Sequence, residues 1–219
     1  FSVRKIVELQ NDQLYAVGWG ALKKFDARLK TITEDKDKLL FDNYEFIAGN
    51  DRTIWALSKK RSGFNGNLID GIMHINPITG AAKSYKINVE ILKLLSEPKI
   101  EDSKGYIWFI GFGGTIYVLD PKTGEGKIVS INTNLINPML KGAQITALYE
   151  DAQGAVWAGT ETGLAKINFE FNAPSKTQVR WYNTNPDDIK ALSYSHVSSI
   201  MDDPADKNIL WVATKGGGL

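Results

Sequence analysis

Cysteine is absent from this chain of 219 residues, and histidine occurs only twice. Without a thiol, the chain can form no disulfide framework, no thiolate nucleophile and no cysteine-based metal site. An excess of charge of either sign is also lacking, since 26 Lys and Arg residues stand against 25 Asp and Glu residues and leave a formal net charge of +1. Proteins that bind nucleic acid or an anionic membrane surface typically carry a basic footprint. We therefore expect neither partner.

Long hydrophobic runs are absent as well. No run approaches the roughly 18 apolar residues of a membrane-spanning helix, and the strongest run, Tyr106–Ile110, ends at a glycine after five residues. The first residues, Phe-Ser-Val-Arg-Lys, lack the apolar core of a signal peptide. We expect no direct membrane insertion of this segment, and we expect any targeting segment to have been removed or to lie outside this sequence.

The chain contains a recurring motif: an acidic pair, a turn with a glycine, and a tryptophan. The motif is Ile-Glu-Asp-Ser-Lys-Gly-Tyr-Ile-Trp at 100–108 and Tyr-Glu-Asp-Ala-Gln-Gly-Ala-Val-Trp at 149–157. A looser copy occupies 201–211, and worn copies occupy 49–55 and 10–15. The copies are spaced by about 40–55 residues without helical patterning, a period typical of β-propeller blades.

Each repeat divides into four short strands, the number found in one propeller blade. Alternation over 145–149 predicts a first strand with Ile145, Ala147 and Tyr149 on one face. The second strand carries the tryptophan, and small residues after it permit close backbone approach. A third strand has an apolar residue, two variable positions, an apolar residue and an Asp or Asn, at 22–26, 72–76, 116–120 and 164–168. Fourth strands are expected at 82–87, 126–131 and 178–182.

The sequence therefore predicts an all-β chain, a partial β-propeller of about four and a half four-stranded antiparallel blades. We place the blades at about 1–40, 41–90, 91–135, 136–184 and 185–219, the last one incomplete. Because propellers usually close with about four to eight whole blades, we expect the remaining blades to lie outside this sequence. Open blade edges would favour a homo-oligomer.

The repeat resembles the two-component regulator propeller repeat. Two motifs carry this resemblance. The first is a Leu-Ser turn followed by Val-x-x-Ile and an acidic pair, at 192–203. The second is the segment from Trp to a closing Gly-Leu, at 157–164 and 211–219. The resemblance implies the periplasmic sensor region of a hybrid two-component histidine kinase and response regulator of the Bacteroides type, built from seven-bladed propellers. It also implies that kinase activity lies elsewhere in the full-length protein, and that this segment is a non-catalytic part whose partner is the remainder of its own receptor.

The repeated aromatic and acidic residues are interpreted as structural. Tryptophan rings can stack on sugars, but their equivalent placement in every repeat is what packing between sheets requires. The aspartates lie about one blade apart and do not converge on one metal, whereas an Asp followed by a Gly of positive φ is typical of a capped turn. This structural set consists of Trp55, Trp108, Trp157, Trp211, Asp102, Asp151, Asp203, Gly105 and Gly154.

Catalytic signals are weak. His74 occupies a variable strand position and His196 follows the Leu-Ser turn, and no Gly-x-Ser-x-Gly elbow is present. Thr-Gly turns such as 123–124 also occur in quinoprotein propellers, but nothing else in the sequence supports a quinone. We expect no catalytic residue, no metal and no cofactor. Two alternatives stay open: a propeller lyase or hydrolase, and a plain protein-interaction scaffold.

One interruption of the repeat marks the candidate ligand site. The connection from Trp55 to Ile72 is much longer than its counterparts, and its extra stretch 59–67 is cationic and rich in amides. In propeller topology it lies on the same face as the blade-to-blade loops 132–144 and 183–195. Cations, amides and an aromatic ring suit an oligosaccharide, a carbohydrate-derived signal; a solvated insertion is the other interpretation. The candidate ligand-binding residues are Trp19, Lys60, Arg61, Phe64, Asn65 and Asn67.

Overall fold

The computed structural model describes residues 3–9, 13–18, 21–26, 31–33, 44–51, 53–58, 71–79, 81–86, 95–111, 115–131 and 144–218. The chain divides into two compact units, Phe1–Lys93 with Asp120–Glu125, and Leu94–Leu119 with Gly126–Leu219. Each unit is described by itself.

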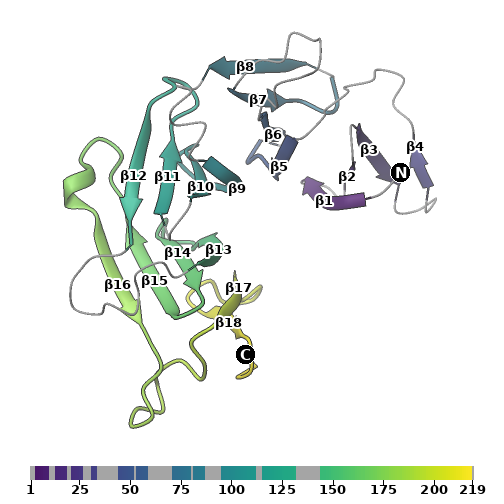
Figure 1. The fold of residues 1–219 in the computed structure, drawn as a ribbon. Helices are drawn as coiled ribbons and strands as arrows, with labels where there is room; N and C mark the ends of the chain where they lie inside the picture. The colour runs from purple at the N-terminus through teal and green to yellow at the C-terminus, as the bar shows by residue number, and fades with distance from the viewer. Residues whose placement is uncertain are drawn as a thin grey trace. The chain divides into compact units, whose positions relative to one another are not determined.

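The described residues form β-strands that follow one another along the chain (Figure 1), with one 3-10 turn at Pro174–Lys176. The strands of the first unit are β1 Val3–Leu9, β2 Gln13–Gly18, β3 Ala21–Asp26, β4 Thr31–Thr33, β5 Tyr44–Ala48, β6 Ile54–Ser58, β7 Gly71–Ile75 and β8 Ala82–Lys86. Those of the second unit are β9 Leu95–Glu101, β10 Ile107–Gly111, β11 Thr115–Leu119, β12 Gly126–Ser130, β13 Ile145–Glu150, β14 Val156–Thr160, β15 Gly163–Asn168, β16 Gln178–Tyr182, β17 Val197–Asp202 and β18 Leu210–Thr214.

These strands form antiparallel meanders, one sheet for each repeat. Four sheets have four strands, in the orders β1-β2-β3-β4, β5-β6-β7-β8, β9-β10-β11-β12 and β13-β14-β15-β16, and a fifth described sheet pairs β17 with β18. We call these sheets blades 1 to 5. The all-β, propeller-like architecture that the sequence predicts is confirmed. The predicted third-strand pattern forms β3, β7, β11 and β15, and the predicted fourth strands form β8, β12 and β16.

A β-bulge shapes the first strand of blades 4 and 5. The pairing of β13 with β14 shifts between Ile145 and Ala147, and that of β17 with β18 shifts between Val197 and Ser199. A bulge adds one residue to a strand, so residues three apart can share a face. Ile145 accordingly packs with Leu148, while Ala147 packs in a different cluster. The prediction that Ile145 shares a face with Ala147 and Tyr149 is therefore wrong, because simple alternation omits the bulged residue.

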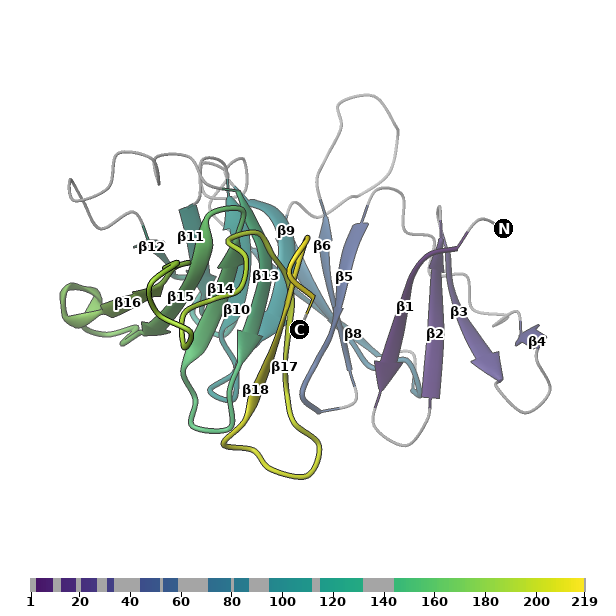
Figure 2. The ribbon, with the colours of Figure 1, turned by 90° about the horizontal axis from the view of Figure 1, so that it is seen from below.

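The first strands of the second unit lie against one another. Strand β13 packs on both β9 and β17 (Figure 2). Residue Thr146, at the bulge of β13, donates its hydroxyl to the carbonyl of Val197 in β17 at 2.5 Å. A Cβ on Gly159 of β14 would stand 2.6 Å from Cγ1 of Val197. The predicted close backbone approach after the tryptophan is thus confirmed, since only glycine leaves room for the neighbouring blade here.

Aromatic side chains from one connection strengthen the packing between blades 3 and 4. The segment between β15 and β16 carries Phe169 and Phe171, both buried in the same cluster as Trp108. The Tyr106 ring stacks on Phe171 with centroids 4.5 Å apart, and Trp108 meets Phe169 edge-on at 5.5 Å. Blade 4 therefore sends this connection back over blade 3, which contributes apolar burial beyond the strands themselves.

Candidate functional site

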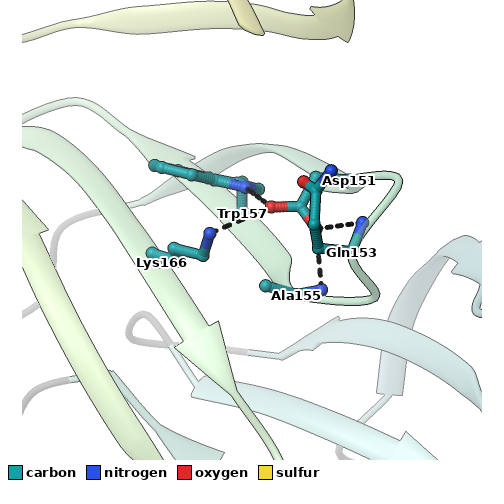
Figure 3. Close-up of polar contacts among 5 residues, drawn as sticks. All are labelled: Asp151, Gln153, Ala155, Trp157 and Lys166. Atoms are coloured by element: carbon teal, nitrogen blue, oxygen red, sulfur yellow. Dashed lines mark hydrogen bonds and ion pairs between the residues drawn. The ribbon is translucent and has the colours of Figure 1, made fainter. Parts of the chain in front are cut away.

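The turn between β13 and β14 is organised by the carboxylate of Asp151 (Figure 3). Its Oδ1 accepts hydrogen bonds from the backbone N–H groups of Gln153 at 3.1 Å and Ala155 at 2.9 Å. Its Oδ2 accepts the indole N–H of Trp157 at 2.7 Å. One side chain therefore holds the turn and fixes the tryptophan at the start of the next strand. We call this arrangement the Asp–Trp pair.

The same pair recurs in blades 3 and 5. The carboxylate of Asp102 accepts the indole N–H of Trp108 at 2.8 Å, and that of Asp203 accepts the indole N–H of Trp211 at 2.7 Å. Asp203 and Trp211 are eight residues apart, against six for Asp151 and Trp157. The contact thus persists although the turn of blade 5 is longer.

A cation completes the pair in blade 4. The ammonium group of Lys166, on β15, lies 3.1 Å from Oδ2 of Asp151 and 4.9 Å from the centre of the Trp157 ring. Burial by itself raises the pKa of Asp151, but the hydrogen bonds from Trp157 and Ala155 and the charge of Lys166 outweigh it and lower the pKa below its ordinary value. In Asp203, the hydrogen bond from Trp211 is the main cause of a lowered pKa.

Blade 2 lacks the Asp–Trp pair. In strand register, Ile47 faces Trp55 as Tyr149 faces Trp157, so Gly49 stands where the other blades have the aspartate. The N–H of Gly49 bonds to the carbonyl of Thr53 at 2.8 Å, as that of Asp151 does to Ala155 at 2.9 Å. The buried indole N–H of Trp55 has no acceptor among the described residues. Asn50-Asp51, which the sequence suggests as the substitute for the acidic pair, is displaced along the turn.

His74 occupies the position of Lys166 in blade 2. It lies opposite Trp55 on β7 and stacks on that ring, with centroids 4.0 Å apart and planes 11° apart. Its Nε2 is 3.4 Å from the carboxylate of Asp51, and the Thr53 hydroxyl contacts both groups. Burial by itself raises the pKa of Asp51, but the Thr53 hydrogen bond and the electrostatic interaction with the His74 ring lower it below its ordinary value. The histidine is thus part of an aromatic stack within its own blade.

In blades 4 and 5, the first member of the acidic pair interacts with the preceding blade instead. In blade 4, Glu150 accepts hydrogen bonds from the backbone N–H of Ser103 at 2.6 Å and from the Ser103 hydroxyl at 2.8 Å. In blade 5, burial together with the neighbouring Asp202 carboxylate raises the pKa of Tyr149. One acid of the pair therefore holds its own turn, and the other contacts the blade before it.

The tryptophans differ in burial. Trp108 is 1% exposed and Trp55 is 3% exposed, while Trp157 is partly buried beneath the neighbouring blade. Trp211 is 43% exposed. The Trp157 ring is approached by Lys166 of β15 and Tyr182 of β16, and its described sheet has four strands, whereas the described sheet of Trp211 has two.

Turns and blade-to-blade loops meet on one face of the second unit. The N–H of Glu161 donates to the carbonyl of Gln144 at 3.2 Å, and the N–H of Lys215 donates to the carbonyl of His196 at 2.8 Å. In each case the turn after the tryptophan strand contacts the residue that precedes a first strand. The loop 183–190 on this face is exposed throughout. This face, which we call the loop face, fits the topology expected from the sequence.

The predicted ligand-binding residues cannot be placed on it. Trp19 and the stretch with Lys60, Arg61, Phe64, Asn65 and Asn67 lie outside the described residues. Within the part of the chain that the structure describes, no three metal-ligating side chains come together, and no helix has the length and apolarity to cross a membrane. Tyr194, an exposed aromatic residue on the loop face, is not among the residues predicted from the sequence, although it is the only aromatic ring in the loop 183–195.

These repeats define a class of protein: an all-β, propeller-like chain in which an aspartate-held tryptophan recurs in blades 3, 4 and 5. Residues 139–162 match the family model of the two component regulator propeller, so the chain carries the repeat that its sequence resembles. Histidine kinase P4 of Formosa agariphila is 35% identical over 80 residues, which is 36% of this chain and 6% of that protein.

Solved structures share the fold. The extracellular domain of the proposed hybrid two component system BT4673 of B. thetaiotaomicron superposes with a TM-score of 0.62 at 18% identity, over 97% of this chain and 26% of that one. Virginiamycin B lyase of Staphylococcus aureus matches with a TM-score of 0.55 at 14% identity, over 94% of this chain and 61% of the enzyme. The chain thus spans about a quarter of that extracellular domain and a small part of the kinase. Because the extracellular domain of a two component system and a lyase both share its fold, the fold alone does not choose between these functions.

Proposed function

We propose that this chain is a non-catalytic, ligand-binding part of the extracytoplasmic sensor of a hybrid two-component receptor, located in the periplasm. The observation that carries the proposal is the use of the repeated polar groups. Asp102, Asp151 and Asp203 are each engaged by backbone N–H groups and an indole, which leaves them to structure rather than to chemistry. The family match at 139–162 supports a signalling receptor over an enzyme.

The ligand proposed is an oligosaccharide, and the insertion at 59–67 is proposed to bind it. Loops on a rigid scaffold are the usual carriers of binding function. The insertion adds cations, amides and Phe64 to a chain whose repeats are otherwise regular. Such a set can hydrogen-bond sugar hydroxyls and pack on the apolar face of a sugar ring. The remainder of the receptor is the proposed structural partner of this chain.

Calorimetric titration of the complete receptor ectodomain with a panel of host and plant oligosaccharides tests this function. Saturable binding of one saccharide is expected, and it should weaken when Lys60, Arg61 and Phe64 are replaced together by Ala. Absence of binding across the panel, combined with tight binding to a protein partner, would replace the sensor by an interaction scaffold. Release of a cleaved or eliminated product during the titration would favour the lyase or hydrolase alternative.

A further inference from the structure

A half-exposed aromatic residue on the loop face of blade 5 stands apart from the repeat. Tyr194 is 50% exposed and lies in the loop that leads into β17. Because Lys215 bonds to His196 as Glu161 bonds to Gln144, the two loops align, and Tyr194 corresponds to Gly142 in the sequence of blade 4. An aromatic residue is therefore not what the repeat requires at this position.

The glycine segment after β18 is shaped to this ring. Three ring atoms of Tyr194, namely Cζ, Cε1 and Cε2, lie 3.2–3.4 Å from the place where a Cβ of Gly216 would stand. The backbone of Gly216 has a φ of +112°, a value that residues other than glycine rarely adopt. The tyrosine thus rests on bare backbone, and any side chain at 216 would have to displace it.

Polar groups lie beside the same ring. A Cβ added to Gly217 would stand 2.6 Å from the hydroxyl oxygen of Ser193 and 3.0 Å from Cβ of Tyr194. The serine hydroxyl and the base of the tyrosine side chain are therefore close to each other. Ser193 also lies 3.5 Å from the hydroxyl of Thr214. The exposed Lys215 directly precedes Gly216 in the chain. An aromatic surface with a serine hydroxyl nearby is therefore present on a solvent-exposed face, and a lysine is next to the supporting glycine in the sequence.

We infer that Tyr194, supported by Gly216 and accompanied by Ser193 and Lys215, is a stacking platform for one sugar ring of the ligand. The C–H groups on one face of a pyranose can pack on the tyrosine ring, while the sugar hydroxyls can bond to the serine and lysine. A ring already held against backbone loses little conformational freedom on binding, which favours affinity. This inference rests on the proposed saccharide-sensing function and names the residue that would contact the sugar.

Titration calorimetry of the full chain tests the platform, with maltohexaose, laminarihexaose, xylohexaose and a chondroitin sulfate hexasaccharide as probes. For the saccharide that binds, Tyr194→Ala should weaken affinity roughly tenfold, whereas Tyr194→Phe, which keeps the ring, should change it by less than about twofold. Gly216→Ala should also weaken binding, because the added Cβ shifts the Tyr194 ring although the tyrosine itself is not replaced. Ile189→Ala, at a fully exposed position of the same loop, is the matched control and should bind as the unaltered chain does.

The outcomes separate the inference from the function on which it rests. Full affinity in the Tyr194→Ala and Gly216→Ala variants, with a saccharide still bound, overturns the platform and leaves the sensing function intact. Failure of every probe to bind the unaltered chain counts against the saccharide function, and the platform falls with it. If Tyr194→Ala lowers the thermal midpoint by more than a few degrees, the affinities of Gly216→Ala and Tyr194→Phe are compared instead. Weaker binding by Gly216→Ala than by Tyr194→Phe supports the platform, and equal affinity overturns it.

Discussion

Trp157 and Trp55 occupy the same register position in two blades, yet their indole N–H groups have different surroundings. In blade 4 the indole donates to Asp151 at 2.7 Å, and the same carboxylate holds the turn. In blade 2 a glycine replaces that aspartate, and the buried indole of Trp55 has no acceptor among the described residues. A repeat can therefore keep its strands and its aromatic filling while it loses the polar contact that connects turn and core.

The cross-strand neighbour shows the same contrast. Lys166 gives Trp157 a permanent cation and Asp151 an ion pair, whereas His74 gives Trp55 a flat stacking partner. Stacking supplies dispersion and apolar burial but no acceptor for the indole N–H. The difference shows that tryptophan packing and aspartate bonding are separable contributions to blade stability.

The largest effect is expected from removing a fully buried ring. Trp108→Ala should lower the free energy of unfolding by about 3–5 kcal/mol, because it leaves a large cavity and removes the indole hydrogen bond to Oδ2 of Asp102. Trp211→Ala should have a much smaller effect, since that ring is 43% exposed. Chemical denaturation of both variants measures the difference. Equal losses would contradict the idea that burial, rather than the aspartate contact, dominates the tryptophan contribution.

Removing the aspartate comes next. Asp151→Ala should destabilise the chain by about 2–3 kcal/mol, because the indole of Trp157 and two turn N–H groups lose a charged acceptor. Asp51→Ala, in the blade without the Asp–Trp pair, is the matched control and should be clearly milder, since Asp51 touches Thr53 and His74 at the surface. Denaturant midpoints at neutral pH compare the two. A loss of similar size in both variants would remove the distinction between the blades.

Installing the missing carboxylate should reverse part of the contrast. Gly49→Asp places an acceptor at the register position of Asp151, six residues before Trp55, and should stabilise the chain by about 1 kcal/mol. Gly49→Ala, which adds a side chain without a carboxylate, separates the acceptor from the effect of replacing glycine. Thermal unfolding measures both. If the aspartate variant is no more stable than the alanine variant, the missing acceptor for the indole N–H of Trp55 does not lower the stability of the chain.

The smallest expected effect is a dependence on acid. The pKa of Asp151 is lowered in the folded chain, so its contribution to stability is present above the ordinary Asp value of about 3.9 and is lost as pH falls through the folded value. The stability difference between the unaltered chain and Asp151→Asn should accordingly shrink as pH is lowered from about 5 to about 3. Denaturant titrations at several pH values follow this difference. A constant difference would show that the ionised form of Asp151 has no special role.

Local patterns in the sequence predict much of this fold. The third-strand pattern became β3, β7, β11 and β15, and the turns at Gly105 and Gly154 have φ of 84° and 81°, as the Asp-x-x-Gly spacing suggests. These features depend on residues within a few positions of one another. The bulge of β13 was not predicted. Its apolar residues 145 and 148 are three positions apart, and in a regular strand residues with this spacing lie on opposite faces.

Contacts between repeats were not predictable in the same way. Glu150 and Ser103 are 47 positions apart, and Thr146 and Val197 are 51 apart, so no local pattern links them. The packing of Phe169 and Phe171 on blade 3 likewise depends on how two sheets face one another. The candidate ligand residues remain a prediction, since Trp19 and the stretch 59–67 lie outside the described residues.

By itself, the sequence determined that this chain is a series of four-stranded repeats, because strand alternation, turn glycines and the recurrence of the same motif can be read directly from the order of the residues. The tertiary structure decided which polar groups are used within that scaffold: one acid for its own tryptophan, the other for the preceding blade, and no acid for Trp55. The physical reason is that hydrogen bonds and packing depend on strand register and on the neighbouring sheet, and a shift of one or two residues, as at Gly49, changes a partner without changing the pattern.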